Sequence, residues 1–448
     1  MMKRTILRKI FILYITLLTF LPTMVHAETG TDVFGADISA PNYCLMEVTT
    51  GRVLAERGMD DVVFPASTTK LVTAMVAYDH LAADLPITYV AEALEVGEGS
   101  SLSGFMPGDS FSRADIIRGL MIPSGNDIGR LIAITVARRE TGNRSMPADA
   151  CEAYLVKLMN EKAAAYGAQK THFVNTHGFH DENHYTTPYD MALIATHIRD
   201  YPELSEIVAE KSHVIQAADE TGLVRHEYEL YSHNEILINP ELSFPEADGI
   251  KTGYTPEAGY TLLASAGNGK ERMVVSIFKA ESGAARALDA KTLLTGGLKN
   301  ARTDTIPPAG EAVMRMPIVN ARSGDDPNME LLPATPVIFA GTEAERAAVN
   351  ANITYDETLL TKTEDGWEIR SDIAAGTVAG HVRYELAGLI VGETDLVTRT
   401  DIRKGSFFHN LKYRMYEQHP VAGWSLTAFV GLVILLLIRF RIKHGRRR

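Results

Sequence analysis

Cysteine is scarce in this chain. Only Cys44 and Cys151 occur among 448 residues, and no Cys-x-x-Cys pair is present. This scarcity excludes a disulfide-rich secreted scaffold and a zinc site built from cysteine pairs. The two thiols lie far apart in the sequence, which does not decide whether they pair, and we expect both to be buried thiols.

Basic residues are scarce in the body of the chain. The net charge is -12, and ten of the cations stand in the first and last ten residues, so the remaining body carries -22. Recognition of a phosphate backbone requires a basic surface, so no nucleic-acid partner is expected. Repeats and low-complexity tracts are absent, and a content of 46% hydrophobic and 22% charged residues indicates ordinary globular domains.

Residues 1–27 have the pattern of a signal peptide. Basic residues come first, an apolar run covers 10–21, and Val25, His26 and Ala27 form a small-residue cleavage site before Glu28. An uncleaved anchor is the alternative, although the run is short for a bilayer span. Both interpretations predict export of the chain.

The C-terminal end predicts a membrane anchor. Residues 421–438 are apolar apart from Ser425 and Thr427, and the basic tail 439–448 follows them. About 20 apolar residues cross a bilayer core, and a basic flank stays cytoplasmic. We therefore expect a single-pass protein of the cell membrane, with 403–420 as a connector and the preceding domains on the extracytoplasmic face. A buried helix is the alternative.

The patterns between these ends predict two domains. Strands are expected at 43–48 and 52–55, helices at 67–81, 112–120, 127–139, 151–166 and 189–199, then strands at 260–266 and 272–278 and a helix at 284–294. This order indicates an α/β or α+β domain over 28–300, with one sheet covered by helices. Short β-type runs at 313–319, 337–340, 367–369, 376–386 and 389–398 predict a small all-β domain over 308–402.

The first of three short motifs places Ser67 three residues before Lys70, at the start of a predicted helix. Residues three apart share a helix face, so the hydroxyl and the amine can meet. A serine becomes a nucleophile when a base takes its proton, and lysine can be that base if its pKa falls from about 10.4 toward neutrality. Taken alone, the motif is equally typical of an N-capping serine beside a solvated lysine.

The second motif is Ser124, Gly125 and Asn126, in a break between two predicted helices. Proline, glycine and asparagine make turns, so an ordinary interhelical loop is the alternative.

The third motif is Lys251, Thr252 and Gly253, in a stretch that could form a strand. Such a strand can pair with an extended peptide along its edge, and glycine allows another backbone to come close. A solvated strand lysine is the alternative.

The three motifs in this order form the set of the serine penicillin-recognising enzymes. Within that group the chain resembles the low-molecular-mass D-alanyl-D-alanine carboxypeptidases over residues 41–294, and less sharply over 308–402. The resemblance implies an α+β catalytic domain of the serine β-lactamase and transpeptidase type. It is carried by the contexts Pro-Ala-Ser67-Thr-Thr-Lys70, Ser124-Gly-Asn126-Asp and Asp-Gly-Ile-Lys251-Thr-Gly253-Tyr-Thr, and by the stretch 171–178.

The resemblance also implies how the site works on peptidoglycan stem peptides. Ser67 would form an acyl-enzyme at the D-Ala-D-Ala bond, Lys70 would take its proton, and penicillins would acylate the same serine. The remaining assignments are Ser124 as proton relay, Asn126 for positioning, Lys251 for positive charge, Thr252 and Arg286 for the terminal carboxylate, Gly253 as part of the substrate strand, and the N–H groups of Ser67 and Tyr254 as the oxyanion hole. For Arg286, a surface helix arginine is the alternative.

Two further stretches lie near the expected site. His177, His180 and His184 could suggest a metal site, but no carboxylates complete it, and the stretch matches a structural loop of the family. We expect no metal and no cofactor. The segment 95–105 matches the family only at residues 99–102, which leaves the deacylation step open.

Four other functions remain alternatives on sequence alone. A β-lactamase shares the three motifs but needs a dedicated deacylating base, and a D,D-endopeptidase differs only in the bond it cleaves. A non-catalytic wall-associated scaffold would be expected to lack competent residues at the motif positions, which this chain retains. Another exported serine hydrolase, such as an esterase, is the last alternative.

Overall fold

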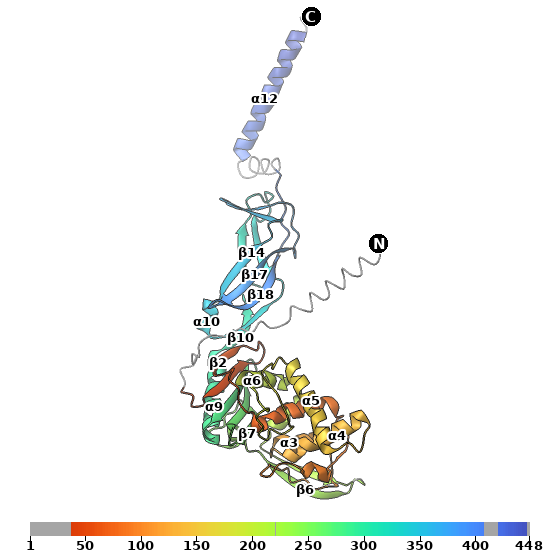
Figure 1. The fold of residues 1–448 in the computed structure, drawn as a ribbon. Coiled ribbons are helices and arrows are strands. Elements are labelled where there is room, and N and C mark those ends of the chain that lie inside the picture. The colour runs from red at the N-terminus through yellow and green to blue at the C-terminus, as the bar shows by residue number, and fades with distance from the viewer. Residues whose placement is uncertain (1–36, 220, 407–419, 446–448) are drawn as a thin grey trace. The chain divides into compact units, whose positions relative to one another are not determined.

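The computed structural model describes residues 37–219, 221–406 and 420–445, and within 420–445 the side chains of 424–439. The predicted signal peptide, most of the connector and the end of the basic tail therefore lie outside the described residues. The chain forms two units (Figure 1): the first runs to Thr303 and includes Ala340–Ala344, and the second holds Asp304–Phe339 and the chain from Glu345 onward.

The first unit is built on a five-stranded antiparallel sheet with the strand order β2-β1-β9-β8-β7. Successive side chains of a strand face opposite sides. In β1, Cys44 and Met46 accordingly join one apolar cluster, whereas Tyr43 and Leu45 join another. The strands are β1 Asn42–Glu47, β2 Val53–Arg57, β7 Ala247–Thr255, β8 Gly259–Gly267 and β9 Arg272–Ala280.

Helices cover both faces of this sheet. Helix α9, Gly283–Asn300, contributes Leu293 and Leu294 to the cluster that contains Leu45. The other face is covered by α6 and by the helices around α2. Their bounds are α2 Lys70–His80, α3 Arg113–Met121, α4 Asn126–Thr141, α5 Ala148–Ala165, α6 Pro188–Thr196 and α7 Pro202–Val208, with the short helices η1 Ala66–Thr69, η2 Ala91–Leu94, η3 His197–Asp200 and α8 Glu235–Ile238.

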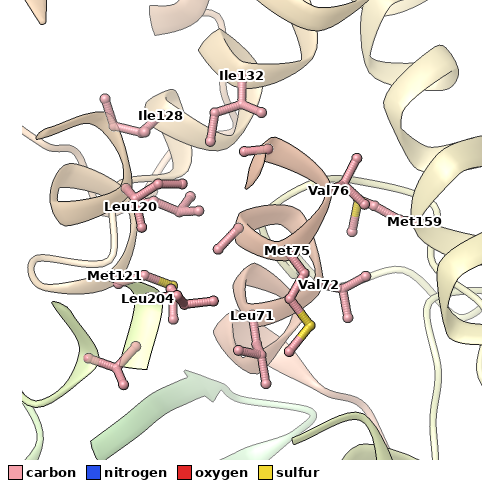
Figure 2. Packing of buried hydrophobic residues seen from close by; sticks show 14 of the residues in the cluster. Leu71, Val72, Met75, Val76, Leu120, Met121, Ile128, Ile132, Met159 and Leu204 are labelled. Atoms are coloured by element: carbon pink, nitrogen blue, oxygen red, sulfur yellow. The ribbon is translucent and has the colours of Figure 1, made fainter. Parts of the chain in front are cut away.

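Helix α2 is the centre of the larger cluster. Its first eight residues are buried and six of them are apolar, as expected for a helix enclosed by others. Figure 2 shows Leu71, Met75 and their neighbours on α2 surrounded by side chains of α3, α4, α5 and α7. Leu71 is fully buried, so truncating it to alanine should cost about 2–5 kcal/mol of stability. This packing holds the N-terminal end of α2 in a fixed position.

A second, smaller sheet completes the first unit. Its antiparallel order is β3-β4-β5-β6, with β3 Ile87–Thr88, β4 Ser110–Phe111, β5 Ser212–Ala218 and β6 Val224–Tyr231. We did not predict β5 and β6. Most of their side chains are exposed or half-buried, and their polar sequences lack the apolar alternation by which strands are recognised.

The second unit contains the predicted β-rich segment. Its main sheet has the order β11-β12-β18-β17-β14, and Trp367, Phe339 and Leu396 lie in its apolar core. The pairs β15-β16 and β10-β13 form two-stranded sheets. The elements of this part of the chain are β10 Arg302–Ile306, β11 Met314–Pro317, β12 Asn328–Pro333, β13 Val337–Gly341, α10 Glu343–Ala348, β14 Asn350–Tyr355, β15 Leu360–Thr363, β16 Gly366–Ile369, β17 Val378–Leu386 and β18 Leu389–Thr398.

The last helix, α12, covers Pro420–Gly445 and includes the predicted membrane span. Over the portion of the chain that the structure describes, no helix is both long and apolar enough to cross a membrane. The predicted anchor is therefore not confirmed by this criterion and stays a prediction.

The two cysteines are as expected. Cys44 and Cys151 are both buried, and neither forms a disulfide. Burial raises the pKa of both thiols, which keeps them protonated and unreactive.

Candidate active site

The predicted nucleophile Ser67 lies in η1, directly before α2. The chain enters this turn through Ala66, which has a φ of 48°, a left-handed conformation that residues with a side chain rarely adopt. The turn is fixed by Thr68, whose hydroxyl donates to the Pro65 carbonyl oxygen (2.7 Å), and by Thr261 of β8, whose hydroxyl donates to the same oxygen (3.1 Å). The predicted helix start is thus a tight 3₁₀ turn that continues into α2.

Lys70, the first residue of α2, is fully buried, and its side chain meets three oxygen atoms. Its Nζ lies 2.8 Å from Ser67 Oγ and donates to Asn126 Oδ1 (2.7 Å) and to the His177 carbonyl oxygen (2.9 Å). The hydroxyl and the amine that the first motif predicted to meet are therefore in direct contact. Asn126 comes from the second motif, so two of the three motifs converge here.

The surroundings favour an uncharged Lys70. Burial, followed by the positive charge of Lys251, lowers the pKa of Lys70 well below its usual value, and the charge of Asp127 opposes this effect. A neutral amine has two N–H donors and one lone pair. Because the oxygen atoms of Asn126 and His177 can only accept, they take the two donors, and the lone pair is left facing the Ser67 hydroxyl.

The second motif forms the turn between α3 and α4. Ser124 has a φ of 64° and is 9% exposed, and Asn126 opens α4. A Cβ at Gly125 would lie 2.9 Å from the Gly119 carbonyl oxygen, so only glycine fits this turn without displacement. Asn126 Nδ2 donates to Ser100 Oγ (2.9 Å), which leaves Asn126 Oδ1 facing Lys70.

The loop 95–105 is held against this turn by a buried carboxylate. Asp127 accepts hydrogen bonds from Tyr89 OH (2.8 Å) and from the Ser103 backbone N–H (2.9 Å). The Asn126 backbone N–H donates to the Ser101 carbonyl oxygen (2.8 Å). The segment 95–105, which matches the family only in part, thus places Ser100 next to Asn126 in the site.

The third motif lies on β7, at the edge of the main sheet. A Cβ at Gly253 would lie 2.8 Å from the Ser67 backbone nitrogen, so glycine is required for the strand to pass this close to the turn. The backbone of Tyr254 follows directly, and its side chain is 54% exposed. Ser67 and this strand therefore lie side by side, as the predicted oxyanion hole requires.

Lys251 and Arg286 are two further buried basic residues of this region. Lys251 is 3% exposed and donates to the Thr252 carbonyl oxygen (3.0 Å). Burial, and then the positive charge of Arg286, lower the pKa of Lys251 to about 7. Its charge therefore changes near neutral pH.

Arg286 is placed differently from a free carboxylate receptor. It is 5% exposed on α9, and its Nη1 donates to the carbonyl oxygens of Gly253 (2.8 Å) and Thr261 (3.0 Å). Its Nη2 forms an ion pair with Glu235 (3.1 Å). The surface arginine that was the alternative is excluded, and the guanidinium fastens β7 to β8 behind the third motif.

Sequence reasoning missed three contributors to this site. The His177 carbonyl oxygen, Ser100 and Glu235 all contact predicted residues. His177 and Ser100 lie in the family-like stretches 171–178 and 99–102 but were given no role in the site, and Glu235 lies in no motif. Gly178, which follows His177, is the sequence signal that could have located this contact. A Cβ at Gly178 would lie 1.8 Å from the Ala66 carbonyl oxygen, and its φ is 87°, so the structure requires glycine there. A glycine directly after His177 therefore marks the close approach of two loops.

The histidines are part of the framework. His184 accepts from the Val174 backbone N–H at Nδ1 (3.1 Å), so its Nε2 carries the proton that bonds Thr69 Oγ1 (2.8 Å). Burial lowers the pKa of His177 and of His184 to about 3, which keeps both rings neutral. Among the residues that the structure describes, no group of three or more ligating side chains could hold a metal ion.

The chain is similar in sequence to known proteins of one family. The family model described as D-alanyl-D-alanine carboxypeptidase (Peptidase_S11) matches residues 27–282, more than half of the chain. The chain is 25% identical over 406 residues to D-alanyl-D-alanine carboxypeptidase DacF of Bacillus subtilis, covering 90% of this chain and 95% of that protein. It is 28% identical over 403 residues to D-alanyl-D-alanine carboxypeptidase DacC of Escherichia coli, covering 88% and 91%.

Solved structures show the same likeness. The crystal structure of penicillin binding protein 5 from Haemophilus influenzae matches with a TM-score of 0.60 and 25% identity, over 82% of this chain and 99% of that one. The D-alanyl-D-alanine carboxypeptidase DacD from Francisella tularensis matches with a TM-score of 0.61 and 21% identity, over 86% and 99%.

Proposed function

The chain belongs to the D-alanyl-D-alanine carboxypeptidase family, and we propose that it uses Ser67 to hydrolyse the terminal D-Ala-D-Ala bond of peptidoglycan stem peptides. The family match confirms the resemblance carried by the three motifs. Because the matching relatives are named as carboxypeptidases, a β-lactamase, an endopeptidase and a scaffold are not favoured. The observation that carries the proposal is the buried Lys70 amine, 2.8 Å from Ser67 Oγ.

The acylation step follows from the two converging groups. The Lys70 lone pair takes the proton of Ser67, and Oγ attacks the carbonyl carbon between the two D-alanines. The negative charge that develops on the carbonyl oxygen is stabilised by the backbone N–H groups of Ser67 and Tyr254, beside the N-terminal end of a helix. The carbon–nitrogen bond breaks, and the departing D-alanine amine receives a proton through Ser124.

The carboxylate of the departing D-alanine is assigned to the third motif. Lys251 supplies positive charge, and Thr252 supplies a hydroxyl. Arg286 adds its positive charge from behind β7, and its hydrogen bonds to Gly253 and Thr261 keep the strand in register with the substrate. A water molecule then hydrolyses the ester, which releases the shortened peptide and regenerates Ser67. Penicillins acylate Ser67 by the same attack.

We also propose that the enzyme is exported and anchored in the membrane by α12. The support comes from the signal-like pattern of residues 1–27 and the basic tail 439–448. Within α12 the described apolar side chains are exposed, including Leu435 (61%), Leu437 (60%) and Phe429 (62%). Such a surface needs an apolar environment to cover it. Fractionation of cells that express the full chain and a chain truncated at residue 419 tests the anchor, because only the full chain should sediment with membranes.

The activity is tested by D-alanine release from a pentapeptide ending in D-Ala-D-Ala. The wild-type chain should release D-alanine, and Ser67→Ala should not. Cross-linked muropeptides form the second arm of the assay. Monomer products without D-alanine release would instead assign an endopeptidase.

A further inference from the structure

A small polar cavity is lined by Lys251 and Thr252 of the third motif. It has about 10 Å³ of room for the centre of a water molecule, which is the space one water needs. Its walls come from the end of α3, the end of α7, the segment before α8, and β7. Lining residues with polar side chains are Glu210, Ser232, His233, Asn234, Lys251 and Thr252.

Asn234 is the unusual residue in this wall. Its side chain is 4% exposed, and neither Oδ1 nor Nδ2 has a hydrogen-bond partner among the described residues. Asn234 occupies the position before α8, where asparagine side chains commonly accept from the helix backbone, yet it makes no such bond. Burying a carboxamide without hydrogen-bond partners lowers the free energy of unfolding. Both polar atoms of Asn234 therefore indicate a bound partner that the described residues do not supply.

Lys251 has unused donors at the same cavity. Its ammonium group carries three N–H donors, and the Thr252 carbonyl oxygen accepts one of them. A water molecule between the two side chains would accept from Lys251, exchange hydrogen bonds with Asn234, and have the two to four polar partners that buried waters require. We infer that this cavity binds one water molecule, which bridges Asn234 to Lys251 and makes Asn234 a positioning residue for Lys251.

The consequence for catalysis rests on the proposed role of Lys251 in the site. A bridging water solvates the ammonium form and so keeps Lys251 charged to a higher pH than it would be in a dry wall. The other charged or titratable groups around Lys251 act in both directions, with cationic Arg286 opposing its charge. The remaining ones are Lys70 on α2, His233 and Glu235 at α8, and Glu210 after α7.

Two substitutions of Asn234 should move the activity in opposite directions along the pH axis. Asn234→Leu keeps the number and branching of heavy side-chain atoms, is larger, and cannot hold the water. The basic limb of its acylation profile, where the rate falls at high pH, should therefore shift to lower pH. Its rate at pH 7.5 should fall about tenfold. Asn234→Asp keeps the water and adds a negative charge, so its basic limb should shift to higher pH. Ile207→Val, which changes an apolar residue of the same wall, is the matched control and should leave the limb in place.

The experiment measures penicillin acylation and D-alanine release from pH 5 to 10, together with the thermal unfolding midpoint of each full-chain variant. Opposite shifts of the basic limb support the inference. Wild-type pH limbs in both Asn234 variants overturn it, and a higher unfolding midpoint for Asn234→Leu with an unchanged limb shows that the carboxamide is unpaired. A crystal structure of the wild-type full chain gives a readout independent of activity: density for a water between Asn234 and Lys251 supports the inference, and a closed wall there overturns it. Failure of the proposed function would appear separately, as a wild-type chain that neither binds penicillin nor releases D-alanine.

Discussion

Replacing Asn126 by leucine tests how the orientation of Lys70 is set. In the structure Asn126 Oδ1 and the His177 carbonyl oxygen accept the two N–H donors of a neutral Lys70, and the lone pair faces Ser67. Leucine has the same number and branching of heavy side-chain atoms but no acceptor. One buried N–H would then lose its partner, and the amine could turn its lone pair away from the serine.

The expected effect follows from the cost of that lost hydrogen bond. Leaving a buried donor unpaired costs about 1–3 kcal/mol, which corresponds to roughly a 5- to 150-fold slower acylation if the whole cost is felt in the transition state. The assay is stopped-flow acylation by a fluorescent penicillin, with thermal unfolding as a check that the variant is folded. Ser100→Ala is the matched control, because it removes the 2.9 Å bond to Asn126 Nδ2 and leaves the Lys70 contact intact. Acylation of Asn126→Leu within twofold of the wild type, in a folded protein, would refute the reasoning.

Two further predictions concern the framework around the site. Gly178→Ala should abolish acylation and lower the unfolding midpoint, because the new Cβ would lie 1.8 Å from the Ala66 carbonyl oxygen; a folded, fully active variant in the same penicillin assay would contradict the described approach of the two loops. The unfolding free energy should fall as the pH drops from 6.5 toward 3, because folding holds the pKa of His177 and of His184 at about 3 and the unfolded chain binds more protons in this window. Each histidine contributes a loss on the order of 4 kcal/mol, which urea titrations at several pH values measure, and a flat profile over this window would show that the rings are not buried as neutral groups.

Much of the first unit could be predicted from local patterns. The helix that carries Lys70 was predicted because apolar residues dominate the stretch that follows it. Strands β8 and β9 were predicted from the Gly-Asn-Gly turn between them. The hairpin of β5 and β6 was missed, because a polar, exposed strand has no periodic apolar pattern to reveal it. The two strands pair with each other along their length, from Ser212–Tyr231 to Ala218–Val224, and this backbone pairing leaves no apolar pattern in the sequence.

The same limit applied to the site. Ser67 and Lys70 are close in sequence, so their contact could be predicted from helix geometry alone. The carbonyl oxygen of His177 reaches Lys70 across 107 residues, and every residue has such an oxygen, so no side-chain pattern could single it out. Arg286 was expected to face the substrate, but its partners Glu235, Gly253 and Thr261 became visible only once β7, β8 and α9 were packed together.

The central claim is that Ser67, activated by Lys70, is the residue that becomes acylated. Mass spectrometry of the full chain after incubation with benzylpenicillin, followed by peptide mapping, tests it most directly. We predict a single penicilloyl adduct on the peptide that contains Ser67, no adduct on Ser67→Ala, and a greatly slowed adduct on Lys70→Ala. An adduct on another residue, or equal labelling of the Ser67→Ala variant, would contradict the account.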